Sequence, residues 1–381
     1  MSGPSADTLI DRIRALAPLV ADHRGAFDRD RRLPAPVFEA LAEAGLFRLL
    51  LPTALGGPEL SPLDFMRVVE AAAALDGSVG WLVGNGGGMS RAGGYLAPEV
   101  AGPWFQNPHA FIAAATGAVG TAEPAEGGYR VGGRWPFGSG IHHATVAMGL
   151  CAVPASDPAA PPETLCCYLL PDQYAVIDTW QVSGLRGTGS CDFEVRDVFV
   201  PAARTHRFLT HTPTQAGLPY RIPTVSAFAI TVSVVPLGIA DAALDAFCSL
   251  AATRARGPGM LREREIIQAE VGRAATLLGA ARAFLAGAIA TLMAATEAND
   301  DTLSAARATL RAAGAHAAET ALAVTGMLAA AAGSAAIFET HVLERCVRDA
   351  QAAARHIAMS PSNYMITGRL RLGLEPATPR F

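Results

Sequence analysis

The segment from Gly127 to Ala144 holds side chains that could contact a flat, redox-active ring. Trp135 is a planar aromatic residue, and Ser139 lies between two glycines. The glycines let the backbone approach a ligand closely, and the serine hydroxyl can both donate and accept hydrogen bonds. Two adjacent histidines, His142 and His143, follow at the end of an expected strand. The segment suits a flat ring better than a phosphate, although a hairpin with an aromatic plug explains the same residues.

A second glycine-rich stretch, 184–189, has the sequence GLRGTG. Nucleotide-binding loops of the Rossmann and P-loop types must open a helix, because the helix N-terminus faces the phosphates. Here Phe193 to Arg196 alternate as a strand does. We therefore exclude both nucleotide motifs and favour a turn that leads into a strand, which leaves Arg186 and Thr188 able to touch a ligand.

Other catalytic and metal-binding patterns are missing from the sequence. It contains no HExxH motif, no paired cysteine and histidine spacing, no acidic cluster and no GxSxG elbow. His142 and His143 are neighbours, so on a strand they face opposite sides and do not easily chelate one ion. The six cysteines show no CxxC spacing, and we expect reduced, mostly buried thiols rather than a catalytic cysteine. We predict no metal site.

A helix near the C-terminus carries three polar side chains on one side. With ideal helical geometry, Arg345, Asp349 and His356 project within roughly 40° of one another. They flank an apolar stripe that includes Cys346 and ends at Ile357. A histidine at the edge of a core stripe can face a ligand and exchange protons near neutral pH. A surface histidine, or one that caps the helix C-terminus, explains the same spacing.

The start of another expected helix is rich in arginine. Arg262, Arg264 and Arg273, with Gln268 between them, could bind phosphate groups. Glutamates at 263, 265 and 270 alternate with these residues. A solvated helix face with surface ion pairs explains the same charges, and we favour it.

Periodicity divides the chain into three parts. Residues 1–112 show the helical spacing of apolar residues, and residues 223–381 show it with greater regularity. Residues 113–222 consist of short alternating or apolar runs between Gly, Pro and Asp. The clearest strands are Val146 to Val153, Leu165 to Leu170 and Phe193 to Val200, with a loop over Pro154 to Pro162. The pattern predicts a mainly α fold with a central β domain and a C-terminal four-helix bundle.

Composition restricts the partners and the location of the chain. The net charge of −4 and the pI near 6.1 give no general attraction to nucleic acid or to an anionic membrane. Charged residues interrupt the N-terminal segment, so we predict no signal peptide and a cytoplasmic location. Two apolar runs, Val225 to Ala240 and Thr320 to Phe338, predict buried helices rather than membrane spans. With 51% hydrophobic and 17% charged residues, we expect a homo-oligomer, specifically a homotetramer.

Taken together, these segments resemble the acyl-CoA dehydrogenase superfamily along nearly the whole chain. The resemblance is greatest to its two-component flavin-dependent monooxygenases, which include aromatic hydroxylases, dibenzothiophene monooxygenase and the amino-sugar nitrososynthases. Four places carry it in the same order and spacing: Leu51-Pro52 with Gly56-Gly57, Gly127 to Ala144, Gly184 to Pro201, and Arg348-Asp349 with His356. It implies a helical N-terminal domain, a β-sandwich or barrel in the middle and a C-terminal four-helix bundle.

The resemblance also implies a reduced flavin, FMNH2 or FADH2, which a separate reductase supplies and which reacts with O2 to give a C4a-hydroperoxide. In that picture the flavin lies between the β domain and the bundle, and His356 stabilises or protonates the peroxide. The residues implied to line the isoalloxazine are Trp135, Phe137, Ser139 and Gly140, with Ser139 near its N5 edge. Further candidates are Arg186, Thr188, Arg262 and Gln268 for the cofactor, and Asn85, Thr116 and His142 for the substrate.

An acyl-CoA dehydrogenase needs a carboxylate base to desaturate its substrate. Such enzymes carry a glutamate near the start of the bundle or after its last long helix, but Ser226 to Ala240 contains none and the second region reads Arg355-His356-Ile357. We therefore predict a monooxygenase that hydroxylates, or N- or S-oxygenates, a small aromatic or polycyclic compound. The alternatives are an FAD-dependent acyl-CoA dehydrogenase and a catalytically silent oligomeric binding protein with the same fold.

Departures from the family pattern concern the substrate. Phenol-hydroxylating relatives often carry a histidine in the helix after Gly80-Trp81, where this chain reads LVGNGGG. Asn85 in this stretch can hydrogen-bond a substrate but cannot act as a base. Thr116-Gly117 and Val146 stand where relatives often have serine and tryptophan. These differences argue against simple phenol ortho-hydroxylation, and the glycine-rich segment 84–94 suggests room for a bulkier substrate.

Overall fold

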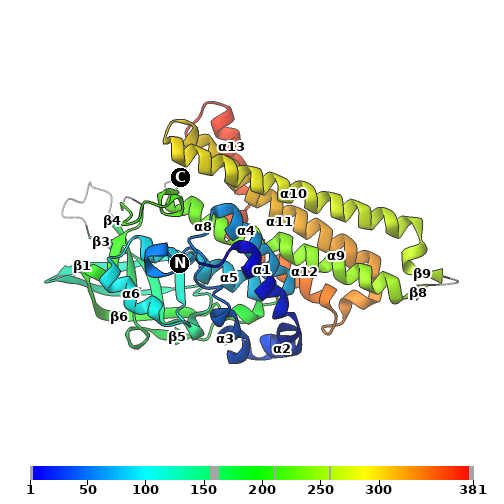
Figure 1. Ribbon diagram of the computed structural model, residues 1–381, viewed down its shortest axis with the longest axis horizontal. Coiled ribbons are helices and arrows are strands. Elements are labelled where there is room, and N and C mark those ends of the chain that lie inside the picture. The colour runs from blue at the N-terminus through cyan, green and yellow to red at the C-terminus, as the bar shows by residue number, and fades with distance from the viewer. Residues whose placement is uncertain (1–2, 155–162, 210–211, 257–258, 377–381) are drawn as a thin grey trace. The chain divides into compact units, whose positions relative to one another are not determined.

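The computed structural model describes residues 3–154, 163–209, 212–256 and 259–376 (Figure 1). From residue 155 onward, the predicted loop over 154–162 lies outside the described residues. The chain forms two compact units. The first comprises Met1–Ser61, Leu82–Gln181 and Arg186–Ala227, and the second comprises Pro62–Trp81, Val182–Leu185 and Phe228–Phe381.

A mixed seven-stranded sheet forms the centre of the first unit. Its strand order is β5-β6-β2-β1-β3-β4-β7, in which β1 and β3 are parallel and all other neighbours are antiparallel. The strands are β1 (Ile112–Ala125), β2 (Gly128–Trp135), β3 (Val146–Val153), β4 (Glu163–Leu169), β5 (Ala175–Ile177), β6 (Asp192–Pro201) and β7 (Thr205–Arg207). The three clearest predicted strands are thereby confirmed as β3, β4 and β6, because β-branched and apolar residues bounded by turn residues favour the pleated conformation.

Strand β1 contains an irregularity in the middle of the sheet. Ala115 pairs with Gly149 of β3, and the next pair joins Val119 with Leu150. Residues 116–118 of β1 therefore have no pairing partner in β3 and form a bulge. Such bulges bend a strand and redirect its side chains, and they occur often beside active sites. Thr116, a predicted substrate contact, lies in this bulge.

Trp135, at the end of β2, belongs to the core of the first unit. Its side chain is 0% exposed, its indole N–H donates to the carbonyl oxygen of Leu150 (2.9 Å), and its ring stacks on that of Phe193 with centroids 5.2 Å apart. Three glycines make room for the indole, because a Cβ atom on any of them would overlap it; they are Gly120, Gly133 and Gly149. The prediction that Trp135 lines a bound ring is therefore corrected to a packing role.

The first unit also contains several helices. Ser5 begins the first of them by accepting the backbone N–H of Thr8 (3.3 Å) at the helix N-terminus. The helices of this unit are α1 (Ala6–Ala15), α2 (Ala17–Asp30), α3 (Ala35–Glu43), α6 (Pro98–Gln106) and α7 (Leu218–Arg221), while α5 (Gly77–Met89) and α8 (Thr224–Ser233) pass from one unit into the other.

The glycine-rich segment 84–94 serves close packing rather than open space. Gly86 of α5 packs against the ring of Phe111, and Gly94 packs against the ring of Tyr220. Gly87 and Gly93 are closely covered in the same way by residues from 46–55. A Cβ atom at any of these four positions would overlap a neighbour, so the prediction that these glycines leave room for a bulkier substrate is wrong for them.

Long helices make up the second unit, as Figure 1 shows for α10 and α11. The helices are α4 (Pro62–Leu75), α9 (Val235–Thr253), α10 (Glu265–Ala298), α11 (Thr302–Ala332), α12 (Val342–Ala353) and α13 (Ser362–Arg371). Helices α9 to α12 pack on one another, α4 covers α9, and α13 packs on α11. This arrangement confirms the predicted four-helix bundle. Apolar residues at helical spacing bury one side of α10, namely Ile267, Ala274, Leu278, Ala281 and Leu285. A two-stranded hairpin of β8 (Ala255–Arg256) and β9 (Gly259–Met260) precedes α10.

Among the described residues, three helical stretches have the length and apolar composition of a membrane span. They are Thr224–Thr253, Glu265–Ala298 and Thr302–Ile337. In the first, 78% of the apolar window is buried within the chain, as the sequence predicts for Val225 to Ala240. In the other two only 33% is buried, so much of the apolar surface of α10 and α11 is exposed, and the predicted burial of Thr320 to Phe338 holds only in part.

Candidate functional site

Two motifs that lie about 50 residues apart in sequence meet in the first unit. The Ser139 hydroxyl lies 2.8 Å from that of Ser190, which in turn lies 2.7 Å from that of Thr188. The backbone N–H of Gly140 donates to the carbonyl oxygen of Thr188 (2.8 Å) and fixes the two turns together. All three hydroxyl groups belong to buried residues. They form a chain in which each oxygen can donate and accept, so the terminal hydroxyl can adapt to a donor or an acceptor on a ligand.

Sequence reasoning finds Ser139 and Thr188 but misses Ser190. Ser190 comes two residues after Thr188, in the turn that leads into β6. A serine in such a turn usually satisfies local backbone groups. Its role as the link between the two motifs depends on a contact across 51 residues of sequence and has no local signal.

Phe137, and not Trp135, presents an exposed aromatic ring. Its side chain is 65% exposed, although phenylalanine is a residue that folding normally buries. Its backbone adopts φ 64°, in the left-handed region that residues other than glycine rarely occupy. Strain of this kind is concentrated at functional sites. Phe137 and the Ser139 hydroxyl chain therefore present an apolar ring and a polar chain within three residues of one another.

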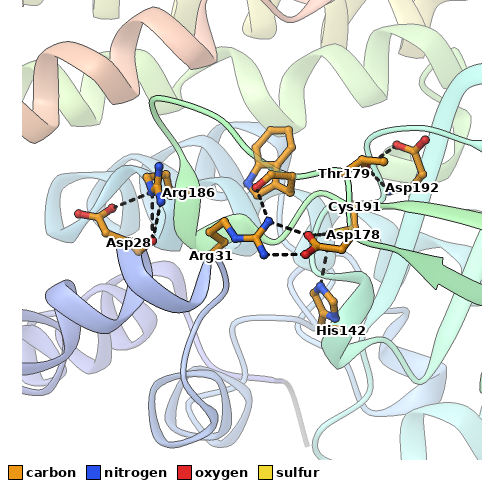
Figure 2. A network of polar contacts seen from close by, with 9 residues as sticks. Asp28, Arg31, His142, Asp178, Thr179, Arg186, Cys191 and Asp192 are labelled. Carbon is orange, nitrogen blue, oxygen red and sulfur yellow. Dashed lines mark hydrogen bonds and ion pairs between the residues drawn. The ribbon is translucent and has the colours of Figure 1, made fainter.

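Arg186 is used within the protein rather than directed at a ligand. Its Nε and Nη2 atoms donate to the carbonyl oxygen of Asp28 at 3.1 and 2.9 Å, near the C-terminal end of α2 (Figure 2). The Asp28 carboxylate lies 3.9 Å from the Arg186 Nε. A guanidinium near a helix C-terminus satisfies carbonyl groups that the helix leaves unpaired. This geometry argues for a structural role and against the predicted cofactor contact of Arg186.

A polar network surrounds His142 in the same unit (Figure 2). His142 Nε2 lies 3.4 Å from Cys191 Sγ. Arg31 holds Asp178 with two hydrogen bonds of 2.6 and 2.7 Å, which lower the pKa of the Asp178 carboxyl. Loss of water around the His142 ring, and then the charge of Arg32, lower the pKa of His142. The neutral form of His142 is thus favoured near pH 7, and as a substrate contact it would donate or accept a hydrogen bond without carrying charge.

The sequence suggests that His142 and His143 lie at the end of a strand, but they do not. They belong to a 3-10 turn, Ile141–His143, and have different partners. His143 Nε2 lies 3.0 Å from the carbonyl oxygen of Leu33, and the His143 ring stacks on Phe38. Among the described residues no group of three or more His, Cys, Asp and Glu side chains could hold a metal ion.

The predicted substrate contacts Asn85 and Thr116 both lie in the first unit. Asn85 is half-buried in α5, and Thr116 is half-buried in the bulge of β1. The packing of Gly86 on Phe111 brings α5 against the residue that precedes β1. Asn85 is thus next to a residue that packs just before β1, although the sequence places Asn85 and Thr116 31 residues apart.

His356 lies in the second unit, beyond the end of α12. The helix ends at Ala353, so His356 does not share a helix face with Arg345 and Asp349, and that prediction is wrong. Its Nδ1 accepts the backbone N–H of Ala358 (3.2 Å), and its ring packs edge-on against Trp81 with centroids 5.5 Å apart. Because Nδ1 is an acceptor, the neutral ring carries its proton on Nε2. Burial lowers the pKa of His356 to about 4, so the ring is neutral at pH 7.

Arg262 and Gln268 lie at the start of α10 and are exposed. Gln268 Nε2 donates to the carbonyl oxygen of Arg262 (3.1 Å) and fixes the turn before the helix. Their contact with a cofactor stays a prediction.

The fold and these side chains together define a class of protein. Helices, a mixed sheet and a long-helix bundle follow one another along the chain, and the candidate groups of the first unit are buried hydroxyls, an exposed aromatic ring and the imidazole of His142. Such groups suit a heteroaromatic redox cofactor with its own donors and acceptors. This combination is that of a flavin-dependent oxidoreductase built on the acyl-CoA dehydrogenase fold.

Comparison with known proteins establishes the family. The family models named acyl-CoA dehydrogenase, N-terminal domain, and acyl-CoA dehydrogenase, C-terminal domain, match residues 6–93 and 230–361. The chain is 33% identical to indole-3-acetate monooxygenase of Pseudomonas putida, over 98% of this chain and 95% of that protein. It is 31% identical to the oxygenase component of the FADH2-dependent resorcinol hydroxylase of Rhizobium sp. (strain MTP-10005), over 97% and 95%. The structure of XiaF from Streptomyces sp. with FADH2 and glycerol matches with a TM-score of 0.88 at 26% identity, over 98% and 97% of the two chains.

The chain therefore belongs to the acyl-CoA dehydrogenase superfamily, and it is the oxygenase component of a two-component flavin-dependent monooxygenase. The predictions of fold class and enzyme class are confirmed. An oxygenase component implies a flavin reductase as partner, and the relatives use a reduced flavin.

Proposed function

We propose that this enzyme inserts one oxygen atom of O2 into a small aromatic or polycyclic substrate. Indole-3-acetate and resorcinol, named for two relatives, are aromatic compounds of this size. The observation that carries the proposal is the hydroxyl chain from Ser139 through Ser190 to Thr188, beside the exposed and strained Phe137.

These residues fit a flavin by their chemistry. The Ser139 hydroxyl can donate to or accept from the polar edge of an isoalloxazine, and Phe137 offers an apolar face for the ring. When bound, the reduced flavin reacts with O2 and supplies the oxygen atom that is transferred. FADH2 is named for two of the proteins above, and the solved structure of KijD3, which shares this fold at 21% identity and a TM-score of 0.84, holds FMN. We favour FADH2, because the two proteins named with it are the more similar to this chain.

His356 then acts as a hydrogen-bond donor rather than as an acid. The neutral ring holds its proton on Nε2, because Nδ1 is occupied by the Ala358 N–H. With a pKa of about 4, His356 is neutral near pH 7 and has no imidazolium proton to transfer. A neutral donor stabilises an oxygen that carries developing negative charge without delivering the proton that would expel hydrogen peroxide.

Asn85, Thr116 and His142 are the proposed substrate contacts. None of them is a strong base, because two are neutral polar side chains and the pKa of His142 is lowered. The substrate is therefore held by hydrogen bonds in the form in which it binds. This favours a substrate whose ring is reactive without deprotonation.

Anaerobic titration with reduced flavin tests the Ser139 site. We expect Ser139→Ala to weaken reduced-flavin binding by about five- to tenfold, the effect of one hydrogen bond. Ser190 keeps Thr188 as a partner at 2.7 Å, so the variant should unfold like the wild type. Ser304→Ala, on an exposed part of α11, is the matched control and should bind flavin normally. Equal affinity of all three proteins would exclude Ser139 from the flavin site.

Assembly as a cytoplasmic homotetramer remains part of the proposal. Supporting it is the apolar outer surface of α10, which exposes Ile266, Leu277 and Phe284. Apolar patches of this kind commonly form subunit interfaces. Light scattering of the wild type and of Leu277→Glu tests the assembly: a tetramer that dissociates in the variant supports it, and a wild-type monomer excludes it.

A further inference from the structure

Two buried aspartates lie near each other in the second unit, and the proposed function uses neither of them. Asp76 follows α4, and Asp349 lies on α12; the two residues are 4% and 1% exposed. Gly77 makes their approach possible, because a Cβ atom there would lie only 3.0 Å from Asp349 Oδ2. One oxygen of each carboxyl has a clear donor: Asp76 Oδ1 accepts the Ser78 N–H (2.9 Å), and Asp349 Oδ1 accepts the Leu185 N–H (2.6 Å).

The remaining oxygen of each carboxyl is buried without a hydrogen-bond donor among the described residues. Arg345 Nη1 lies 3.5 Å from Asp76 Oδ2, which is an ion pair but not a good hydrogen bond. The other nearby cation, Arg348, is bound to Glu344 (3.0 Å) and to the carbonyl oxygen of Ser183 (3.2 Å). Arg345 and Arg348 are thus the cations near the two buried carboxyl groups.

We propose that Asp76 and Asp349 share one proton at neutral pH, and that the protonated pair is a latch that fixes residues 182–185 on α12. A single proton on Asp349 Oδ2 can be donated to Asp76 Oδ2 and satisfies both orphaned oxygens at once. We place the proton on Asp349, because Arg345 and the N-terminal end of α5 lie beside the Asp76 carboxyl. The proposal does not depend on the flavin or on the substrate.

The surroundings of Asp349 agree with this assignment. Burial, and then the charge of Asp76, raise the pKa of Asp349 to about 7, against the opposing effects of the Leu185 N–H, Arg345 and Arg348. Two carboxyl groups that share a site cannot both ionise easily. Keeping Asp349 protonated favours the closed arrangement, and this stabilisation is lost as the pH rises from 3.8, the ordinary pKa, to the raised pKa of about 7.

The proposed latch restrains the backbone of Leu185. Its backbone has φ 52°, a conformation that a leucine adopts only when its surroundings impose it. Gly184 packs directly on the backbone of Arg348, where a Cβ atom would overlap the carbonyl group. The bond from the Leu185 N–H to Asp349 therefore restrains the residue that precedes the turn Arg186–Thr188.

Hydrogen exchange of the Leu185 amide in the full-length protein tests the latch. We expect its protection factor to fall by up to about tenfold per pH unit between 3.8, the ordinary pKa of the aspartate, and its raised pKa of about 7, and to be constant above that value. Asp349→Asn keeps an acceptor for Leu185 and replaces the shared proton by an amide N–H, so protection should become independent of pH. A wild-type protection factor that does not change with pH, or one whose pH dependence persists in Asp349→Asn, would overturn the proposal.

Infrared spectroscopy gives a second, independent readout. We expect the carbonyl band of a protonated buried carboxyl in the wild type at neutral pH, and its loss in both Asp349→Asn and Asp76→Asn. Each single variant should fold, whereas the double variant removes both carboxyl groups beside Arg345 and should be far less stable. Absence of the band in a folded wild type would show that both carboxyls are ionised and would refute the shared proton.

Discussion

Replacing Gly149 by alanine tests the structural account of the sheet. A Cβ atom at this position would lie 2.6 Å from Cε2 of Trp135, about 1 Å inside normal contact distance. The indole cannot move aside freely, because Gly120 and Gly133 pack on it from β1 and β2 and its N–H is bound to Leu150. We expect Gly149→Ala to destabilise the first unit by about 3 kcal/mol, the upper part of the range for overpacking.

Thermal unfolding measures this effect. For a unit of about 200 residues, 3 kcal/mol corresponds to a fall in melting temperature of about 6–12 °C. Trp135→Phe removes the overlapping atoms, so the double variant should be more stable than the two single effects predict by about 1–2 kcal/mol. Gly279→Ala on α10 has no neighbour within 4 Å and should be neutral or stabilising. If Gly149→Ala melts with the wild type, or if the double variant is additive, the packing of Trp135 is not as described.

Three further predictions concern single side chains. The pKa of His356 is about 4 in the folded chain and 6.5 as a reference, so the native state binds fewer protons between these values and stability rises with pH across that window. Because the ring is partly exposed, we expect this effect to change the free energy of unfolding by about 1–2 kcal/mol. His356→Gln should therefore lose less stability than the wild type as the pH falls across this window; an equal loss would show that the ring is not desolvated. Arg186→Lys should lose its paired contacts with Asp28 and about 1–2 kcal/mol of stability without weakening flavin binding, and a selective loss of flavin affinity would restore the predicted cofactor role. Arg130→Ala, which removes a surface ion pair with Asp197, should change the unfolding free energy by less than about 1 kcal/mol in urea titration, and a larger loss would mean that the pair is more than a surface contact.

The sequence predicts the elements well, because their signals are local. Apolar spacing locates the helices of the bundle, and alternating runs locate β3, β4 and β6. The role of Trp135 is not local: its burial depends on glycines of three strands that only the folded sheet brings together. The same is true of Gly86 and Gly94, whose space is filled by Phe111 and Tyr220.

The end of α12 shows a second limit. Helical spacing continues through residue 357 in the sequence, yet the helix stops at Ala353. His356 takes part in this end, because its Nδ1 accepts the N–H of Ala358 and competes with the helical hydrogen bond. A helical wheel continued past Ala353 places His356 on the wrong face. It also places Ile357 in the core, whereas this residue is 71% exposed.

The most direct test of the oxygenase account is rapid mixing of the enzyme and reduced flavin with O2, followed by absorbance and by hydrogen peroxide release. We expect a transient absorbance distinct from reduced and oxidised flavin in the wild type. In His356→Ala, which removes the Nε2–H donor, this transient should decay faster and release more hydrogen peroxide. Direct reoxidation of the flavin in the wild type, with no transient and with peroxide as the only product, would contradict the central claim.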